Sequence, residues 1–192
     1  MYKTFHITIE GVAPLIQNNP EKSDLAQLTG SGKKKTASKQ EKSEEWRDKV
    51  YKVGDKLGHP SIAFDNMVRE AAKNFKGRGR ASMKDSIRQT CWVDGEWLIL
   101  TNRTEPDEVM VSTPSTMSGR VPSYVPVFSP GWRMEFDYQV TDDEIVTSSH
   151  LHEIISWGGQ RIGLGMAHFR PKFGRFIIVG FEEIAAKEHA AV

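Results

Sequence analysis

Strict alternation of apolar and polar residues in two segments limits the fold more than any other feature of the sequence. The pattern runs through residues 2–10 and, most clearly, through residues 131–140. A period of two places successive side chains on opposite faces of a β-strand, so each segment is predicted to be a strand with one buried face. Residues 131–140 have the stronger pattern and are predicted to form a central strand. The chain is therefore expected to contain a sheet with one face packed on the core.

Helical spacing of apolar residues is found between and after these two strands. Helices are predicted within residues 43–53, 61–76, 83–89 and 141–157. The second of these is predicted to start at Ser61 or Asp65 and to stop before Gly77. The last is predicted to start at Thr141 or Asp142 and to end at Gly158 and Gly159, because glycine is common where helices stop.

The remaining strands are predicted from one turn dipeptide and one apolar run. Asp94 and Gly95 suit a tight turn, so residues 91–93 and 96–100 are predicted to pair as a hairpin. Residues 173–181, apolar on both faces, are predicted to form the last strand. The resulting order of elements predicts an α+β fold with a ferredoxin-like (RRM-like) β-α-β-β-α-β core and long loop insertions.

A single domain spanning residues 1–192 is predicted, since this length supports one good hydrophobic core. Polar residues dominate from about 20 to 43, including a run of three lysines at 33–35, which predicts a flexible basic insertion. Five prolines between about 105 and 130 predict a long ordered loop and exclude regular central strands there, although residues 109–112 could form an edge.

Several functional classes are excluded by what the sequence lacks. No apolar run is long enough to span a bilayer, and the first residues do not have the pattern of a secretory signal, so a cytoplasmic protein without a membrane partner is expected. The single cysteine, Cys91, excludes an intrachain disulfide and a cysteine-based zinc site, and is predicted to be a buried thiol. His150 and His152 diverge on a helix and cannot easily share a metal. No metal or cofactor is predicted.

The net charge of +1 does not decide whether the chain binds a polyanion, because binding depends on where the charges lie. Residues 69–88 contain seven basic residues against two acidic ones. The centre of this segment, residues 76–80, combines arginines with glycines that allow backbone amides to approach a phosphate. A solvated loop between two helices is the alternative interpretation.

Residues 158–175 form the most informative segment, because it is rich in glycine and arginine and has no acidic residue. Its glycines permit close backbone approach to a ligand, and Phe169 and Phe173 could stack on bases. Alternatively, the glycines serve turn geometry and the phenylalanines fill the core, as is expected of Phe176 and Phe181. The candidate nucleic-acid-binding residues from the two segments are Lys76, Arg78, Arg80, Arg161, His168, Phe169, Arg170, Lys172 and Arg175.

Catalysis has less support in the sequence. His168 is a candidate general base for a ribose 2′-hydroxyl, with Arg161 or Arg170 stabilising the phosphorane. A lone loop histidine more often forms a hydrogen bond or contacts a phosphate. His6, on the outward face of the first predicted strand, is a second candidate.

Three features together resemble the RAMP superfamily of CRISPR proteins, especially the backbone-forming subunits that coat guide RNA. They are the first strand running into residues 11–16 (Gly-Val-Ala-Pro-Leu-Ile), the ferredoxin-like order of elements, and the segment 158–175 before the last strand. The resemblance covers the two ends of the chain, and the combination resembles a solitary phage or mobile-element relative. It implies repeated copies along a single strand, as a homo-oligomer or filament, with the insertion or the proline-rich loop reaching a neighbour.

The chain departs from RRM domains in one respect. The outward positions of residues 131–140 are Arg133, Glu135, Asp137 and Gln139, without the aromatic residues on which an RRM stacks bases. We therefore expect contacts with a ligand to be made by loops rather than by the sheet face.

Three functions remain open from the sequence. The first is a non-enzymatic protein that binds single-stranded nucleic acid, either RNA or DNA, and self-assembles along it. The second is a metal-independent RAMP-type endoribonuclease that uses His168. The third is a protein-interaction or inhibitor module whose basic loops bind an acidic protein partner.

Overall fold

The computed structural model shows a mixed α/β fold in which all paired strands are antiparallel. None of its helices is long and apolar enough to cross a membrane, within the part of the chain that the structure describes. The described residues are 2–19, 44–77, 81–112, 115–116, 119–120, 123–166 and 172–184.

The main sheet has four strands in the order β12 (Phe176–Ile184), β1 (Lys3–Gly11), β11 (Arg133–Val140) and β5 (Cys91–Asp94). The two alternating segments thus become the two middle strands, paired from Lys3 with Val140 to Glu10 with Arg133. The prediction of a central strand at residues 131–140 is confirmed. The last strand, predicted within residues 173–181, forms as β12 at the sheet edge, where it leaves the apolar residues Ile177 and Val179 about half exposed.

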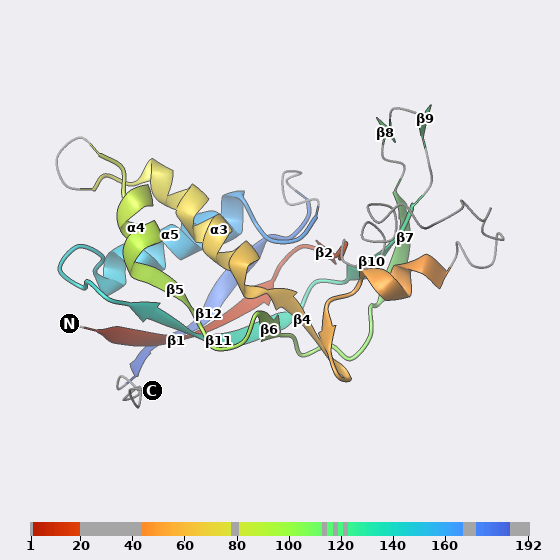
Figure 1. The fold of residues 1–192 in the computed structure, drawn as a ribbon, viewed down its shortest axis with the longest axis horizontal. Coiled ribbons are helices and arrows are strands. Elements are labelled where there is room, and N and C mark those ends of the chain that lie inside the picture. Colours follow the sequence, from red (N-terminus) through yellow and green to blue (C-terminus); the bar gives the residue numbers. More distant parts are fainter. Residues whose placement is uncertain are drawn as a thin grey trace, which may run out of the picture.

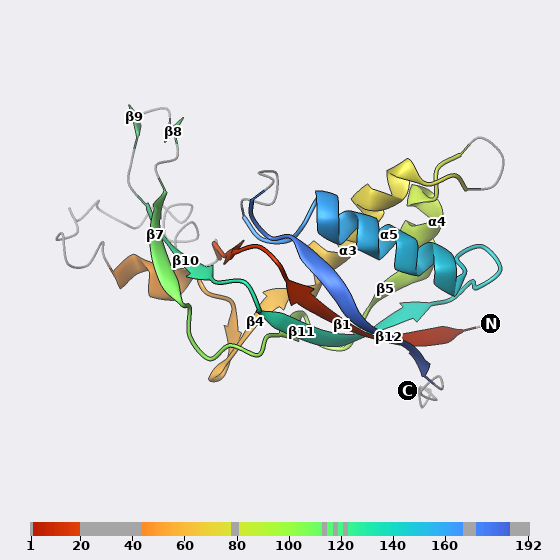
Figure 2. The ribbon, with the colours of Figure 1, turned by 180° about the vertical axis from the view of Figure 1, so that it is seen from behind.

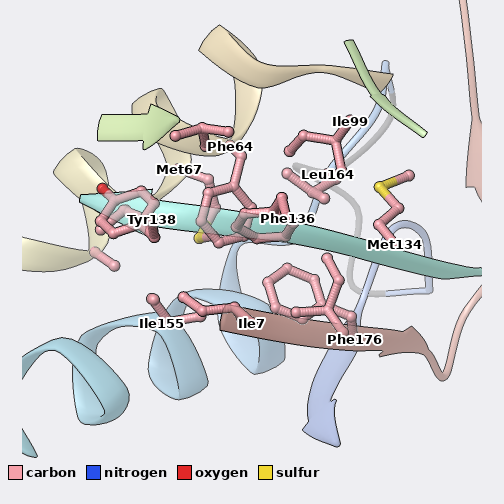
Figure 3. Packing of buried hydrophobic residues seen from close by; sticks show 14 of the residues in the cluster. Ile7, Phe64, Met67, Ile99, Met134, Phe136, Tyr138, Ile155, Leu164 and Phe176 are labelled. Carbon is pink, nitrogen blue, oxygen red and sulfur yellow. The ribbon is translucent and has the colours of Figure 1, made fainter. Parts of the chain in front are cut away.

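Three helices lie on one side of the main sheet, among the described residues: α3 (Ser61–Ala71), α4 (Lys84–Thr90) and α5 (Ser148–Arg161) (Figures 1 and 2). The core fills the space between them and the sheet (Figure 3). Phe64 of α3 lies at its centre, with its ring centroid 4.6 Å from that of Phe136 and 5.9 Å from that of Tyr138. The apolar stripe of α3 and the inward residues of β11 therefore form one core.

The last helix differs from its prediction at both ends. It starts at Ser148, because Thr147 rather than Thr141 or Asp142 caps it by accepting a hydrogen bond from the His150 backbone N–H. It also continues through Gly158 and Gly159 to Arg161. A Cβ at Gly158 would clash with the Met67 sulfur, and one at Gly159 would lie 2.7 Å from the Phe176 ring. These two glycines let α5 approach α3 and β12 closely instead of ending the helix.

The helix predicted within residues 43–53 is replaced by a short 3-10 turn, η1 (Glu45–Lys49), and by the hairpin of β3 (Lys52–Val53) and β4 (Lys56–Pro60). The chain reverses at Gly54, whose φ of +57° suits glycine. The backbone N–H of Gly58 donates to the Tyr51 carbonyl at 3.0 Å, so residues 50–58 pair with one another instead of coiling. A second 3-10 turn, η2 (Ala72–Asn74), extends α3.

The hairpin predicted around Asp94 and Gly95 does not form, although the chain does turn at Gly95, with φ at +107°. β5 joins the main sheet, whereas β6 (Leu98–Leu100) pairs with β4. The carbonyl of Trp97 accepts hydrogen bonds from both the backbone N–H and the hydroxyl of Ser61, which draws the chain after the turn toward the start of α3.

The proline-rich segment contains strands, so the prediction that no central strand forms there was wrong. A small sheet has the order β2 (Leu15–Ile16), β10 (Ser123–Phe128) and β7 (Glu108–Ser112), with β10 in the middle. The carbonyl of Pro126 accepts a hydrogen bond from the Gln17 N–H. The nitrogen and the carbonyl of a residue in an antiparallel strand point to the same side, so the Pro126 nitrogen also faces away from β7, toward the residue that follows β2. The missing N–H of this proline therefore removes no hydrogen bond between β10 and β7. A short pair, β8 (Ser115–Thr116) with β9 (Gly119–Arg120), completes this end of the molecule (Figure 1).

Candidate functional site

Backbone hydrogen bonds hold the segment after α5 against the beginning of the chain. Leu164 donates to the Gly174 carbonyl at 2.9 Å, and Gly174 donates to the Pro14 carbonyl at 2.8 Å. Met166 donates to the Ile16 carbonyl at 2.9 Å. The side chain of Leu164 reaches the main core beside Ile99 and Phe136 (Figure 3). Two of the three features behind the RAMP resemblance, residues 11–16 and residues 158–175, are therefore in direct contact.

The glycines of this segment are required by its geometry. Gly163, Gly165 and Gly174 have φ values of +79°, +84° and +65°, a region that favours glycine. A Cβ on Gly165 would lie 2.5 Å from the Ile16 carbonyl oxygen, and one on Gly174 would overlap the Leu164 carbonyl. The alternative interpretation, that the glycines serve turns and close packing, accounts for these three positions.

Arg175 differs from the expectation that it faces a ligand. Its side chain is buried, and its guanidinium Nη1 donates to the carbonyls of Ile162 and Phe173. Its own carbonyl accepts from the backbone N–H groups of Val12, at 2.9 Å, and Ala13, at 3.1 Å. Burial lowers the pKa of the guanidinium below its ordinary value. Arg175 therefore fixes both ends of the segment and belongs to the framework of the site.

The two basic segments meet on one indole, that of Trp157. The ring of Phe75, next to Lys76 in the chain, lies edge-on to Trp157 with 6.5 Å between ring centroids. The Arg161 guanidinium lies over the same indole, 5.4 Å from its centroid. Lys76 and Arg161 are exposed, and no carboxylate of the described ranges is within ion-pair distance of either. Both cations are thus available to an external anion.

Lys172 is also exposed, with its ammonium 5.9 Å from the centroid of the Phe173 ring. Phe173 packs against the small cluster of Ile16, Val125 and Val127, so its ring is partly buried. As expected from the sequence, Phe176 lies in the core. The other candidates of the two basic segments lie outside the described residues: Arg78, Arg80, His168, Phe169 and Arg170.

A cleft of about 540 Å³ opens between α3 and residues 162–166, and we call it the α3 cleft. One wall comes from α3 and the end of β4, and the facing wall comes from the segment after α5. Gln17 closes a third side. Its buried amide donates to the Gly58 carbonyl at 2.7 Å and accepts from the Tyr51 N–H at 3.0 Å. The lining residues are Gln17, Asn18, Tyr51, His59, Pro60, Ala63, Asn66, Met67, Arg69, Glu70, Ile162, Gly163, Leu164, Gly165 and Met166.

Arg69 is a cation of this cleft that sequence reasoning did not select. It belongs to the basic run 69–88, but nothing in the sequence separates it from the other cations of that run. Its guanidinium Nη2 donates to the Asn66 side-chain oxygen one turn earlier on α3. The neighbouring Lys73 is instead paired with Glu70 at 2.6 Å. Arg69 lines the cleft and Lys73 does not, and this difference follows from how α3 packs rather than from the sequence.

The face of the main sheet opposite the helices is acidic. His6 lies between Asp137 and Glu182 in the register, and Asp94 lies beside Asp137. The His6 imidazole Nδ1 is 2.8 Å from the Asp137 carboxylate, so this candidate base is held within a row of carboxylates. Two further acidic residues, Glu10 and Glu135, share the face, and Arg133 is paired with the first of them at 2.5 Å. This face would repel a polyanion.

The remaining titratable candidates are dispersed. His150 and His152 are exposed on α5, and the imidazole of His152 lies edge-on to Phe181 at 5.1 Å. Among the described residues, no three His, Cys, Asp or Glu side chains gather in a way that would hold a metal ion. Cys91 is buried, as predicted, and burial raises the pKa of its thiol to about 11.

Comparison with known proteins reveals a likeness in structure but not in sequence. No protein-family model matches the chain, and no curated protein matches it. A chain from the cryo-EM structure of the Type III-B Cmr-beta bound to cognate target RNA has a similar fold, with a TM-score of 0.55 and 12% sequence identity. The match covers 95% of this protein and 61% of that chain, so this protein spans less than two thirds of its neighbour's length. At this identity the likeness is one of fold.

Proposed function

We propose that the protein binds single-stranded nucleic acid, RNA or DNA, without catalysing a reaction, as one domain with a ferredoxin-like, RRM-like core of the RAMP type. The sheet order β12-β1-β11-β5 supports this core, as do α3 between β1 and β5 in the chain and α5 between β11 and β12. The similar fold of a chain from a complex bound to target RNA supports the same assignment.

The observation that carries the proposal is the meeting of Arg161 and the Phe75–Lys76 pair on Trp157. Arg161 directly precedes Ile162, which lines the α3 cleft. Cations from two distant parts of the chain thereby border one surface, and no carboxylate of the described residues pairs with them. Exposed cations without partners attract phosphates, and the binding they give is sequence-independent. Arg69 adds a further cation in the α3 cleft, and Lys172 is a further exposed cation of the segment 158–175.

The acidic sheet face supports binding on the helix side. An RRM binds RNA on the sheet face that its helices leave open, through stacking aromatic residues. Here the corresponding rows contain Asp94, Asp137, Glu135 and Glu182, and a phosphate backbone placed there would meet like charge. The ligand is therefore expected on the helix side, to which α3 and α5 contribute Arg69 and Arg161.

Salt dependence of binding to a labelled single strand tests the proposal. Affinity should fall steeply with salt, and Arg161→Ala should weaken binding and reduce the slope of log K against log salt by about 0.7, the value for one lost phosphate contact. Arg47→Ala is the matched control, since Arg47 also lies over a tryptophan, at 5.5 Å, but is paired with Glu44. Binding that does not vary with salt, or equal effects of the two variants, would exclude this site.

Self-assembly along the strand is the second part of the proposal. It is supported by the position of β7 and the β8–β9 pair, which project from the end of the molecule away from the main sheet (Figures 1 and 2). Light scattering with and without oligonucleotides of increasing length should show a mass that grows by whole copies of the chain. A single copy bound at every length would refute assembly and leave binding intact.

A further inference from the structure

We infer that the α3 cleft holds one unstacked base of the bound strand, with the phosphates on either side held by Arg69 and Arg161. This assignment rests on the proposed function and adds to it the part of the ligand that the cleft recognises. It requires a single strand, because a base within a duplex would first have to be extruded from the stack.

The size and lining of the cleft suit a base. Its volume of about 540 Å³ falls within the range of pockets that hold small ligands. The apolar part of its lining, which we call the floor, consists of Ala63 and Met67 from the α3 wall and of Ile162 and Leu164 from the facing wall. Hydrogen bonds between Leu164 and Gly174, and between Met166 and Ile16, hold the facing wall in place. The cleft is therefore a preformed recess with an apolar floor.

A fixed aromatic ring borders this recess. The ring of Tyr51 lies edge-on to that of His59, with 5.9 Å between centroids and 83° between planes. Its hydroxyl donates to the Asn18 carbonyl at 3.2 Å, and its backbone N–H donates to the Gln17 side chain. Because hydrogen bonds hold both the hydroxyl and the backbone of Tyr51, its side chain loses little conformational entropy when a base stacks on it.

Two amide side chains at the cleft can bind the edge of a base. The side-chain amide of Asn18 and the Nδ2 group of Asn66 have no hydrogen-bond partner among the described residues, whereas the Asn66 oxygen accepts from Arg69. An asparagine amide offers a donor and an acceptor that match the polar edges of bases. Polar groups thus stand at the rim and apolar groups at the floor, which is the arrangement that a base requires.

Charges at the rim favour a nucleotide over a neutral planar ligand. Arg69 lines the cleft from α3, and Arg161 directly precedes the lining residue Ile162 on the other wall. The acidic lining residue Glu70 is neutralised by Lys73 at 2.6 Å. A strand that crosses the cleft would therefore place a phosphate near each arginine and the intervening base over the floor.

Abasic oligonucleotides test the inference without changing the protein. We expect a homopolymeric single strand to bind about tenfold or more tightly than an abasic strand of equal length, with the same salt slope, because stacking is lost and phosphate contacts are kept. Equal affinities would overturn the base site while leaving the proposed function intact. No salt-dependent binding of either strand would overturn both.

A filled cleft gives the second test. Ala63→Trp places an indole on the floor and should lower the affinity for the normal strand to that for the abasic strand, with an unchanged salt slope. Ile62→Trp is the matched control, because Ile62 is the adjacent α3 residue, 61% exposed, and does not line the cleft. Thermal melting of both variants verifies folding. If folded Ala63→Trp still binds the normal strand more tightly than the abasic strand, the base lies elsewhere.

Discussion

Gly165→Ala should destabilise the protein much more than Gly54→Ala, although both glycines have positive φ, at +84° and +57°. An alanine in the left-handed region costs about 1–2 kcal/mol at either position. At Gly54 no atom of the described residues, apart from its two chain neighbours, lies within 4 Å of the added Cβ, so this conformational cost is the whole effect.

At Gly165 the added Cβ would also meet the wall of the α3 cleft. It would lie 2.5 Å from the Ile16 carbonyl oxygen and 2.7 Å from the Leu15 Cδ1 atom. Relieving such overpacking costs about 1–3 kcal/mol. The shift that relieves this contact would also break the hydrogen bond from the Met166 N–H to the Ile16 carbonyl, which contributes about 0.5–1.5 kcal/mol. Gly165→Ala is therefore expected to cost about 2–4 kcal/mol more than Gly54→Ala.

Urea denaturation at a fixed pH measures both variants. The expected result is a midpoint that shifts strongly for Gly165→Ala and slightly for Gly54→Ala, with similar m-values. Gly165→Ala should also weaken binding of single strands, because the cleft wall moves, whereas Gly54→Ala should not. Equal losses of stability would show that residues 165 and 16 are not in contact, and the description of the cleft would then fail.

Three further predictions concern titratable groups that are fully or partly buried. Tyr138→Phe should leave the free energy of unfolding unchanged or raise it by up to about 3 kcal/mol, because the buried Tyr138 hydroxyl has no hydrogen-bond partner among the described residues. A loss above about 1 kcal/mol in urea denaturation would contradict this. Burial raises the pKa of Asp65 from 3.8 to about 6, so the folded state holds this proton more tightly than the unfolded state does. The contribution of Asp65 to stability is complete below about pH 4 and is lost as the pH rises through about 6. Between pH 4 and 7 the free energy of unfolding of wild type should therefore fall by about 1–3 kcal/mol more than that of Asp65→Asn, as urea denaturation would measure. The lower end of this range is expected, because Asp65 is only half buried. Burial raises the pKa of Cys91 to about 11, so a thiol reagent should modify it only as fast as the protein unfolds; immediate reaction in the native state would refute its burial.

Elements with strong local periodicity were predictable from the sequence. The alternation in residues 2–10 and 131–140 placed β1 and β11 correctly and assigned their inward faces, because a strand's side-chain period is a property of the backbone alone. The apolar stripe of residues 61–76 likewise identified α3, and residues 83–89 identified α4. These segments needed no knowledge of their partners.

Strand partners could not be predicted in the same way. Residues 91–100 have the turn of a hairpin, yet the two strands join different sheets because Trp97 binds Ser61. Pro126 stands in a middle strand because its nitrogen faces the side where β2 has ended. Both outcomes depend on residues far away in the chain, which local preference does not contain.

The candidate site likewise has features that the sequence predicts and features that depend on distant residues. The sequence by itself determined that two segments rich in cations and glycines, around residues 76–80 and 158–175, follow or flank helices, because composition and spacing are local. Only the tertiary structure decided that Arg175 is buried against carbonyls, that Arg161 shares Trp157 with Phe75, and that Arg69 lines a cleft with Tyr51. The reason is physical: the charge of a side chain is fixed by its chemistry, whereas its exposure and its neighbours are set by how distant elements pack.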